Sequence, residues 1–140
     1  MKPEFERYVE YYNTLTPKSV ENLKTIAAPD LHFVDPFNDV HGVEKVIHIF
    51  EEMFHKLSDP TFKVTEAFEQ GDQLFVRWVF EFHSPFIHFG RKHSIVGVSF
   101  IESKDGKVNS HLDYWDASSQ LYMHLPVIGL LIRGLRRFFA

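Results

Sequence analysis

The chain has 140 residues, of which 44% are hydrophobic and 16% aromatic, with a formal net charge of −4 and no cysteine. This length fits one domain, the apolar content is too high for a disordered chain, and the lack of cysteine excludes disulfides and thiolate chemistry. The negative net charge argues against a nucleic-acid partner. Because the charged N-terminus has no apolar run, we expect no secretory signal and take the cytoplasm as the default location.

The aromatic residues and the charges are both unevenly distributed. There are 15 Phe against 5 Tyr and 2 Trp, which indicates either a large core or a cavity lined with rings, and composition does not choose between them. Residues 117–140 carry three arginines and no acid, a charge of +3. The rest of the chain has 12 basic against 19 acidic residues, a charge of −7.

Three helices are predicted in the first part of the chain. Residues 3–14 have apolar side chains at helical spacing. Thr16 and Pro17 fit the cap and the first position of a second helix over residues 16–28, which Pro29 ends. A third apolar stripe predicts a helix over residues 43–57.

Strands dominate the second part of the chain. A short alternating segment at residues 31–35 predicts a first strand between the second and third helices, and Pro36 ends it. After residue 60 the apolar period changes from 3.6 to 2, and turn signals including Asp105-Gly106 separate the predicted strands. These strands cover residues 61–69, 73–84, 91–102 and 107–117.

This order of elements predicts an α+β domain in which the helices pack on one face of a curved, mainly antiparallel sheet. The other face of the sheet must be covered as well, by a dimer partner or an added helix. We expect residues 1–140 to form one domain, with residues 119–140 as a C-terminal amphipathic helical extension.

The arrangement resembles the nuclear transport factor 2-like superfamily, and within it the ketosteroid isomerase and SnoaL-like branch. The residues that carry the resemblance are Tyr11, the strand segment 32–37 (HFVDPF) and the last strand segment 111–116 (HLDYWD). The resemblance implies a cone-shaped barrel of three N-terminal helices and a sheet, with Asp35 as general base and Tyr11, 24 residues before it, as a second polar group in the cone.

One expected feature of the isomerases is missing. They carry a second acid on the third long strand, and counting without gaps from the Tyr-Trp pair places Val98 at that position. Valine cannot donate a hydrogen bond, so an enolisation would lose an oxyanion donor, an effect on the order of 10²–10³ in rate. We therefore do not expect steroid isomerase activity, and the resemblance implies a pocket more than a reaction.

Alternation along the strands gathers polar groups on one face. Asp35 shares a face with Phe33, and His111 shares one with Asp113. The resemblance implies that these faces and Tyr11 meet in one apolar cavity, where burial and like charge would raise the pKa of one carboxyl group. The residues expected to line the pocket are Phe33, Phe50, Phe54, Trp78, Phe80, Val96, Val98 and Trp115.

Each of these residues has a structural interpretation as well. Asp35 can cap the loop over residues 36–42, His111 and Asp113 can be an internal pair that orders the strand, and Tyr11 can be core. The function is therefore open between a cofactor-free acid–base enzyme (isomerase, cyclase or hydratase) on a small hydrophobic molecule, a non-catalytic ligand-binding module and an interaction domain. No metal site is predicted, because the nine histidines lack a helical i, i+4 pair and there is no cysteine.

The C-terminal segment is the part of the chain least typical of the family. Residues 125–139 are apolar but interrupted by arginines, too short and too broken to span a bilayer. Three interpretations are open: the helix caps the cone or covers the outer sheet face, it forms dimer contacts, or it lies on an anionic membrane. The expected partners are a small hydrophobic ligand and a second copy in a homodimer, with a peripheral membrane contact through this helix as the third interpretation.

Overall fold

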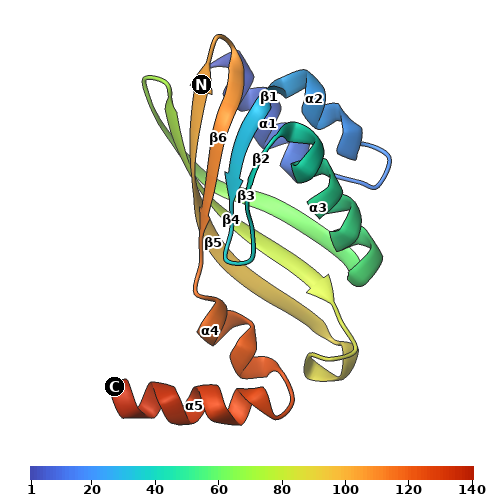
Figure 1. The fold of residues 1–140 in the computed structure, drawn as a ribbon, viewed down its shortest axis with the longest axis vertical. Helices are drawn as coiled ribbons and strands as arrows, with labels where there is room; N and C mark the ends of the chain where they lie inside the picture. The colour runs from blue at the N-terminus through green and yellow to red at the C-terminus, as the bar shows by residue number, and fades with distance from the viewer.

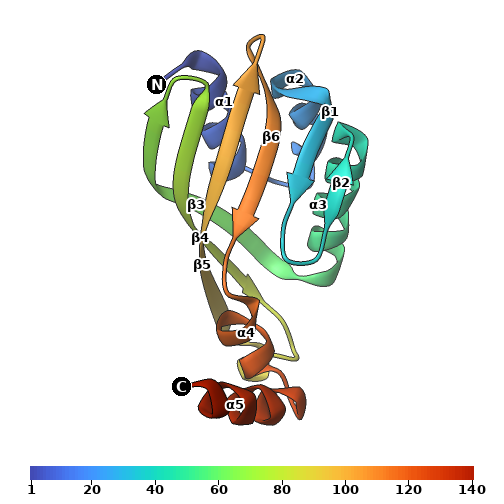
Figure 2. The ribbon, with the colours of Figure 1, turned by 60° about the vertical axis from the view of Figure 1, so that its left-hand side comes forward.

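A computed structural model describes all residues from 1 to 140. It is an α+β structure with one six-stranded sheet in the order β2-β1-β6-β5-β4-β3 (Figures 1 and 2). The strands are β1 (Ala27–Val34), β2 (Asp39–His41), β3 (Ser58–Gln70), β4 (Gln73–His83), β5 (Lys92–Lys104) and β6 (Lys107–Tyr114). Neighbouring strands are antiparallel except β1 and β6, which are parallel. The sheet is open, because β2 and β3 are its two edges and do not pair.

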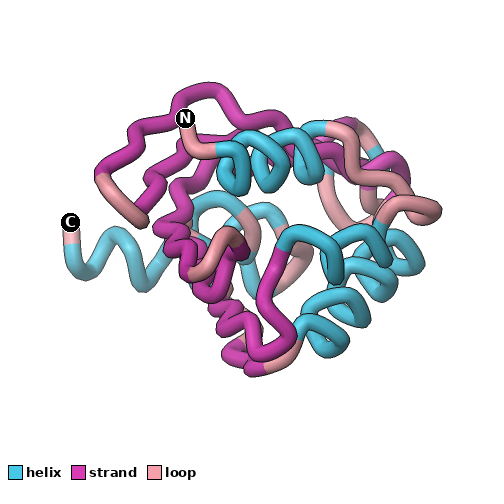
Figure 3. Tube along the Cα trace, turned by 90° about the horizontal axis from the view of Figure 1, so that it is seen from above, coloured by secondary structure: helices cyan, strands magenta, loops and turns pink.

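The helical segments lie before β3 and after β6, apart from one 3₁₀ turn between β4 and β5. The 3₁₀ turns are η1 (Val20–Asn22), η2 (His88–Gly90) and η3 (Tyr122–His124). The α-helices are α1 (Pro3–Asn13), α2 (Leu23–Ile26), α3 (Val43–Lys56), α4 (Ala117–Gln120) and α5 (Ile128–Phe139). Seen from above, the sheet bends around α1, α2 and α3, which lie on its concave side (Figure 3). The core lies between them, and Phe5, Tyr8, Leu23 and Leu31 are completely buried there.

The predicted second helix over residues 16–28 is not confirmed. Residues Thr16 to Ser19 form a turn instead, in which the Ser19 hydroxyl oxygen accepts a hydrogen bond of 2.9 Å from the Thr16 N–H. The apolar residues Val20, Leu23 and Ile26 are three apart, a spacing that fits a 3₁₀ turn as well as an α-helix. Only one α-helical turn, α2, follows before the chain enters β1.

The expectation that Val96 and Val98 line the pocket is wrong. On β5 the odd-numbered residues from His93 to Ser103 are buried, while Val96 and Val98 are 36% and 47% exposed. The register explains this, since Trp78 lies directly opposite Gly97 and both face the core. The residue beside Val98 that points inward is Ser99, so the absence of a donor at Val98 has no bearing on the interior.

The predicted C-terminal helix over residues 119–139 is broken. Leu125 has an extended backbone before Pro126, and Val127 has a φ of 63°, so α4 and η3 end before α5 begins. The Gln120 side chain bonds both the N–H and the C=O of Val96, where β5 extends beyond the end of β6. The extension therefore covers a free strand edge, while α5 lies below the sheet and leaves the outer sheet face open (Figure 1). None of the helices is long and apolar enough to cross a bilayer.

Candidate functional site

A small cavity of about 30 Å³ lies between α1 and the concave face of the sheet. This volume holds about one water molecule, whereas an apolar cavity that binds a benzene-sized ligand is about 150 Å³. Aromatic side chains fill the rest of the space, with Phe62 stacked on Phe80 at 4.4 Å between ring centroids. The cavity is lined by Tyr8, Val9, Tyr12, Phe62, Val64, Val76, Trp78, Ser99, Ile101, His111 and Asp113.

His111 links α1 to a carboxylate on the cavity wall. Its Nε2 lies 2.7 Å from Asp113 Oδ1, and its Nδ1 lies 2.9 Å from the Tyr8 hydroxyl. An ionised carboxylate only accepts hydrogen bonds, so Nε2 carries a proton and donates it to Asp113. In the neutral ring Nδ1 is then the acceptor for the Tyr8 O–H, which fixes the tautomer and the orientation of the imidazole.

A second set of hydrogen bonds holds Asp113 from the neighbouring strands. The Trp78 N–H donates to the Ser99 hydroxyl oxygen at 2.7 Å, and the Ser99 O–H donates in turn to Asp113 Oδ1. Oδ1 therefore accepts from both His111 and Ser99, while Oδ2 makes no hydrogen bond within the protein. The Asp113 side chain is 16% exposed, so this free oxygen is not sealed in the core.

Two tyrosine hydroxyls complete the polar cluster. Burial raises the pKa of both Tyr8 and Tyr12 above the usual value, so both stay protonated and serve as hydrogen-bond donors. The Tyr12 hydroxyl makes only long contacts, 3.4 Å to Tyr8 and 3.4 Å to His111 Nδ1. Its proton is the one that can turn most easily toward a ligand oxygen.

Simple periodicities place these groups together. His111 and Asp113 are two residues apart on β6 and so point to the same face. Ser99 lies directly opposite Asp113 on β5. Tyr8 and Tyr12 are one helical turn apart on α1, so their hydroxyls reach the same region of the sheet.

Asp35 lies just beyond β1 and its carboxylate is used by its own turn. Oδ1 accepts from the Phe37 N–H at 2.8 Å, from the Asn38 N–H at 2.7 Å and from the Asn38 amide at 3.0 Å. Burial raises the pKa of Asp35, these hydrogen bonds oppose the rise, and the negative charge of Asp113 adds a smaller increase. Asp35 is not among the residues that line the cavity.

Tyr11 points away from the cavity, and its hydroxyl donates to the Val20 carbonyl oxygen at 2.9 Å. Tyr11 was the tyrosine predicted for the site, and Tyr8, Tyr12 and Ser99 were not predicted. The i, i+4 spacing of Tyr8 and Tyr12 indicates that they share one side of the helix. Which side of the helix faces β6 depends on packing and cannot be predicted from that spacing. For Ser99 the missing information was the strand register.

The other residues predicted to line the pocket surround the cavity at different depths. Trp78 lines it, and Phe33 is buried beside His111 with 5.0 Å between ring centroids. Phe50 belongs to the same buried core, and Phe54 packs half-buried against it. Phe80 reaches the cavity only through Phe62, and Trp115 packs against Phe37, a half-exposed ring, at 5.7 Å.

One cluster offers metal-ligating atoms. His32, Asp39 and His41 bring their donor atoms within 4.8 Å of one another at the β1–β2 edge of the sheet. His32 Nε2 is already bonded to Asp39 at 2.8 Å, and the two imidazoles are stacked at 4.1 Å and 7°. A metal ion binds in the plane of the imidazole ring that ligates it. Because the two rings are stacked in parallel planes, no position lies in both planes, and the side chains would have to reorganise to hold an ion.

Comparison with known proteins identifies the family. The model of the SnoaL-like domain matches residues 7–111, well over half of the chain. No curated protein matches the sequence.

Solved structures give the fold, at identities too low to indicate more than that. A hypothetical protein with a ketosteroid isomerase-like fold from Catenulispora acidiphila, in complex with trimethylamine, is 18% identical with a TM-score of 0.73, covering 90% of this chain and 95% of its own. A putative SnoaL-like polyketide cyclase from Jannaschia sp. CCS1 is 13% identical, with a TM-score of 0.75 and coverages of 91% and 96%. An epoxide hydrolase of the LEH-like type from M. tuberculosis is 15% identical, with a TM-score of 0.69 and coverages of 95% and 92%. The chain belongs to the SnoaL-like family and has the nuclear transport factor 2-like fold.

Proposed function

We propose that the protein is a cofactor-free enzyme that moves a proton on a small apolar carbonyl compound, with Asp113 as the general base. The observation that carries this proposal is the state of the Asp113 carboxylate on the cavity wall. Oδ1 is held by His111 and Ser99, and Oδ2 has no partner within the protein. A fixed carboxylate with one free oxygen in an apolar, partly closed site is suited to accept a proton.

The reaction step follows from these positions. Asp113 Oδ2 takes a proton from the carbon next to the carbonyl, and the electron pair of that C–H bond forms the C=C bond of an enolate. The negative charge collects on the carbonyl oxygen, where the Tyr12 O–H donates a hydrogen bond. Asp113 then returns the proton to the same carbon or to another carbon of the conjugated system, which regenerates the carboxylate.

His111 acts in this proposal as a positioning residue. It fixes the carboxylate through Nε2 and is itself held by the Tyr8 hydroxyl through Nδ1. A positioned carboxylate loses less freedom in the transition state than a mobile one, so His111→Gln should lower kcat while KM changes little.

The size of the cavity limits the substrate. Ligand-sized sites usually have volumes of about 300–1,000 Å³, far above the 30 Å³ seen here. A substrate can therefore enter only if side chains move. Phe62 is suited to move, because it lines the cavity and is only half-buried. We expect small cyclic or aromatic ketones as substrates rather than large polycyclic ones.

The test is deuterium exchange followed by proton NMR. Cyclopentanone, cyclohexanone and acetophenone are incubated in heavy water with the wild type, Asp113→Asn and Asp35→Asn. We expect exchange next to the carbonyl with the wild type and with Asp35→Asn. Asp113→Asn should lose about 10²-fold or more of the rate. An unchanged rate in Asp113→Asn, or no exchange by the wild type with ketones that bind, would contradict the proposal.

A non-catalytic binding module is the second candidate. What favours it is that every hydroxyl in the cluster already has a partner within the protein. Ketones that bind near Asp113 without any exchange would establish this alternative.

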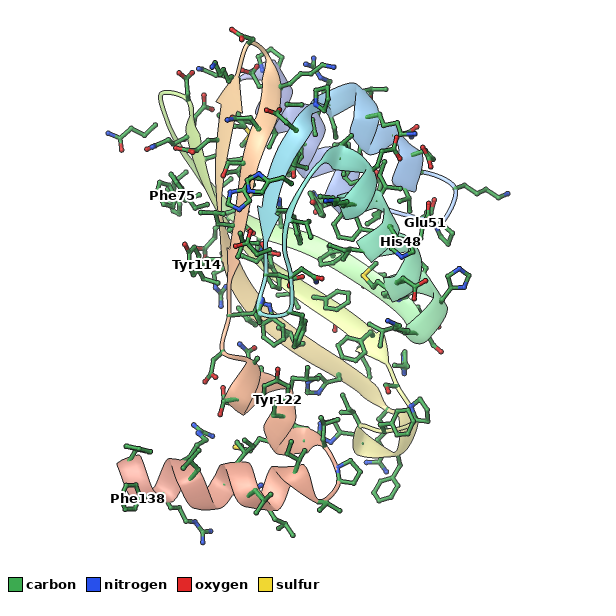
Figure 4. All side chains as sticks on the ribbon, in the orientation of Figure 1. His48, Glu51, Phe75, Tyr114, Tyr122 and Phe138 are labelled. Carbon is green, nitrogen blue, oxygen red and sulfur yellow. The ribbon has the colours of Figure 1, made fainter.

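The outer sheet face supports a homodimer as part of the proposal. Phe68, Phe75 and Phe100 lie directly opposite one another on β3, β4 and β5, and the first two are 68% and 47% exposed. Figure 4 shows Phe75 and Tyr114 on the side of the sheet away from the helices. An exposed apolar row of this kind is typical of a subunit interface. Analytical ultracentrifugation should show a dimer for the wild type and a monomer for Phe75→Arg, and a wild-type monomer would contradict it.

A further inference from the structure

The C-terminal helix α5 has two chemically different sides. At about 100° per residue, its arginines Arg133, Arg136 and Arg137 fall on one side. Leu130 falls on the same side as these arginines. The opposite side carries only large apolar residues: Ile128, Leu131, Ile132, Leu135, Phe138 and Phe139.

Most of the apolar side of α5 does not pack on the protein. Gly129 is buried against the Met123 carbonyl oxygen, and Arg136 contacts the Met123 sulfur at 2.7 Å, so the helix rests on η3 through a flank next to its arginines. Leu131 is 70% exposed and Phe138 is 80% exposed. A surface helix normally buries its apolar stripe against the core, whereas α5 leaves most of its apolar stripe exposed and only Ile132 half-buried.

A second segment exposes apolar rings at the same end of the molecule. The loop before β5 carries Phe86 and Phe89, which are 70% and fully exposed. This loop contacts the extension, since the rings of His88 in η2 and His124 in η3 are 4.9 Å apart between centroids. Figures 1 and 4 show the loop and α5 together at the end of the molecule opposite the N-terminus.

The charge of this end identifies the kind of surface it fits. Residues 117–140 have a charge of +3 with no acid, against −7 for the rest of the chain. Pairing of two α5 helices through their apolar sides would leave the arginines of both copies in solvent, where their charge has no partner. An anionic bilayer satisfies both sides of the helix, because its acyl region takes the apolar residues and its phosphates take the arginines.

We propose that α5, together with the Phe86–Phe89 loop, is a docking surface for an anionic lipid bilayer. The helix has 12 residues and is about 18 Å long, so it lies in the plane of the interface and does not cross the bilayer. This inference is independent of the reaction proposed for the cavity, and its test does not use activity.

The test is co-flotation of the full chain with vesicles, one kind of phosphatidylcholine alone and one of phosphatidylcholine mixed with phosphatidylglycerol. We expect binding to the anionic vesicles at low salt, at least about tenfold weaker binding to the neutral ones, and loss of binding as salt rises. Failure of the wild type to bind anionic vesicles at low salt would overturn the proposal.

A matched pair of variants within α5 tests the geometry. Leu131 and Leu130 are 70% and 71% exposed and about 100° apart around the helix, Leu131 on the apolar side and Leu130 on the side of the arginines. Leu131→Gln should weaken binding about tenfold, because it removes one inserted side chain, while Leu130→Gln should bind like the wild type. Equal losses of binding in the two variants would overturn the proposal. It would also be overturned if Leu131→Gln only abolished a dimer in ultracentrifugation, because the apolar side of α5 would then bind a second copy.

Discussion

The helix-covered half of the molecule and its C-terminal end use the same residue types in opposite ways. In the covered half, Phe and Leu side chains of α1, α3 and the inner sheet face are buried together around a polar cluster. At the other end, α5 exposes Leu135 and Phe138 to solvent. The difference shows that an amphipathic helix becomes part of a core only where a second layer meets its apolar side, and α5 has no such layer within the chain.

Truncating one phenylalanine in each region should give the largest difference. Phe5 is completely buried and Phe138 is 80% exposed. Phe5→Ala should lower the free energy of unfolding by about 3–5 kcal/mol, because it leaves a cavity in the core. Phe138→Ala should change it by less than about 0.5 kcal/mol. Urea unfolding followed by circular dichroism measures both, and similar losses would mean that α5 is packed in solution.

Adding a methyl group in each region should give a smaller difference of opposite sign. A Cβ at Gly97 would lie 2.3 Å from the Trp78 ring, whereas one at Gly134 in α5 would meet nothing within 4 Å. Gly97→Ala should therefore destabilise the protein by about 1–3 kcal/mol through overpacking. Gly134→Ala should be neutral or stabilising by up to about 1 kcal/mol through helix propensity. A stable Gly97→Ala variant would show that the Trp78 ring is not held against β5.

A pH effect confined to the junction of the two regions should be the smallest. Burial lowers the pKa of His124, and the neighbouring His93 and His88 lower it further. The folded state therefore favours the neutral ring, so docking of η3 loses stability as the pH falls below the usual value of 6.5 toward the lowered one. Amide exchange measured by mass spectrometry should become faster in α4 and η3 on acidification, and His124→Gln should remove that change. Uniform acceleration across the whole chain would contradict this assignment.

Local periodicity predicted one pair of residues in the candidate site. The two-residue spacing of His111 and Asp113 placed them on one face, and the structure brings them to 2.7 Å. Counting without gaps from the Tyr-Trp pair placed Val98 at the position of the second acid, whereas Ser99 is the residue that faces the interior. Between the pairs Glu102–Ser110 and Ser103–Val108, Asn109 of β6 is an extra residue. Such a bulge reverses which face each earlier residue takes, and no turn signal in the sequence announces it.

Packing decided what periodicity could not. Tyr8, Tyr11 and Tyr12 are all buried on α1, and only the docking of the helix on β6 separates the two that meet His111 from the one that bonds Val20. The broken C-terminal helix was readable in part, since Pro126 interrupts it. The direction in which α5 turns its apolar side depends on the contact of Gly129 with Met123, which no sequence pattern specifies.

Carbon-13 NMR of protein labelled at the aspartate carboxyl carbons tests most directly whether Asp113 or Asp35 works in the cavity. The two signals are assigned with Asp113→Asn and Asp35→Asn, and cyclohexanone is added as the probe. We expect the Asp113 signal to move on binding. The Asp35 signal should stay in place, because its carboxylate is held by Phe37 and Asn38. Movement of the Asp35 signal with the Asp113 signal unchanged would contradict Asp113 as the base. It would indicate Asp35, in the turn after β1, as the base instead.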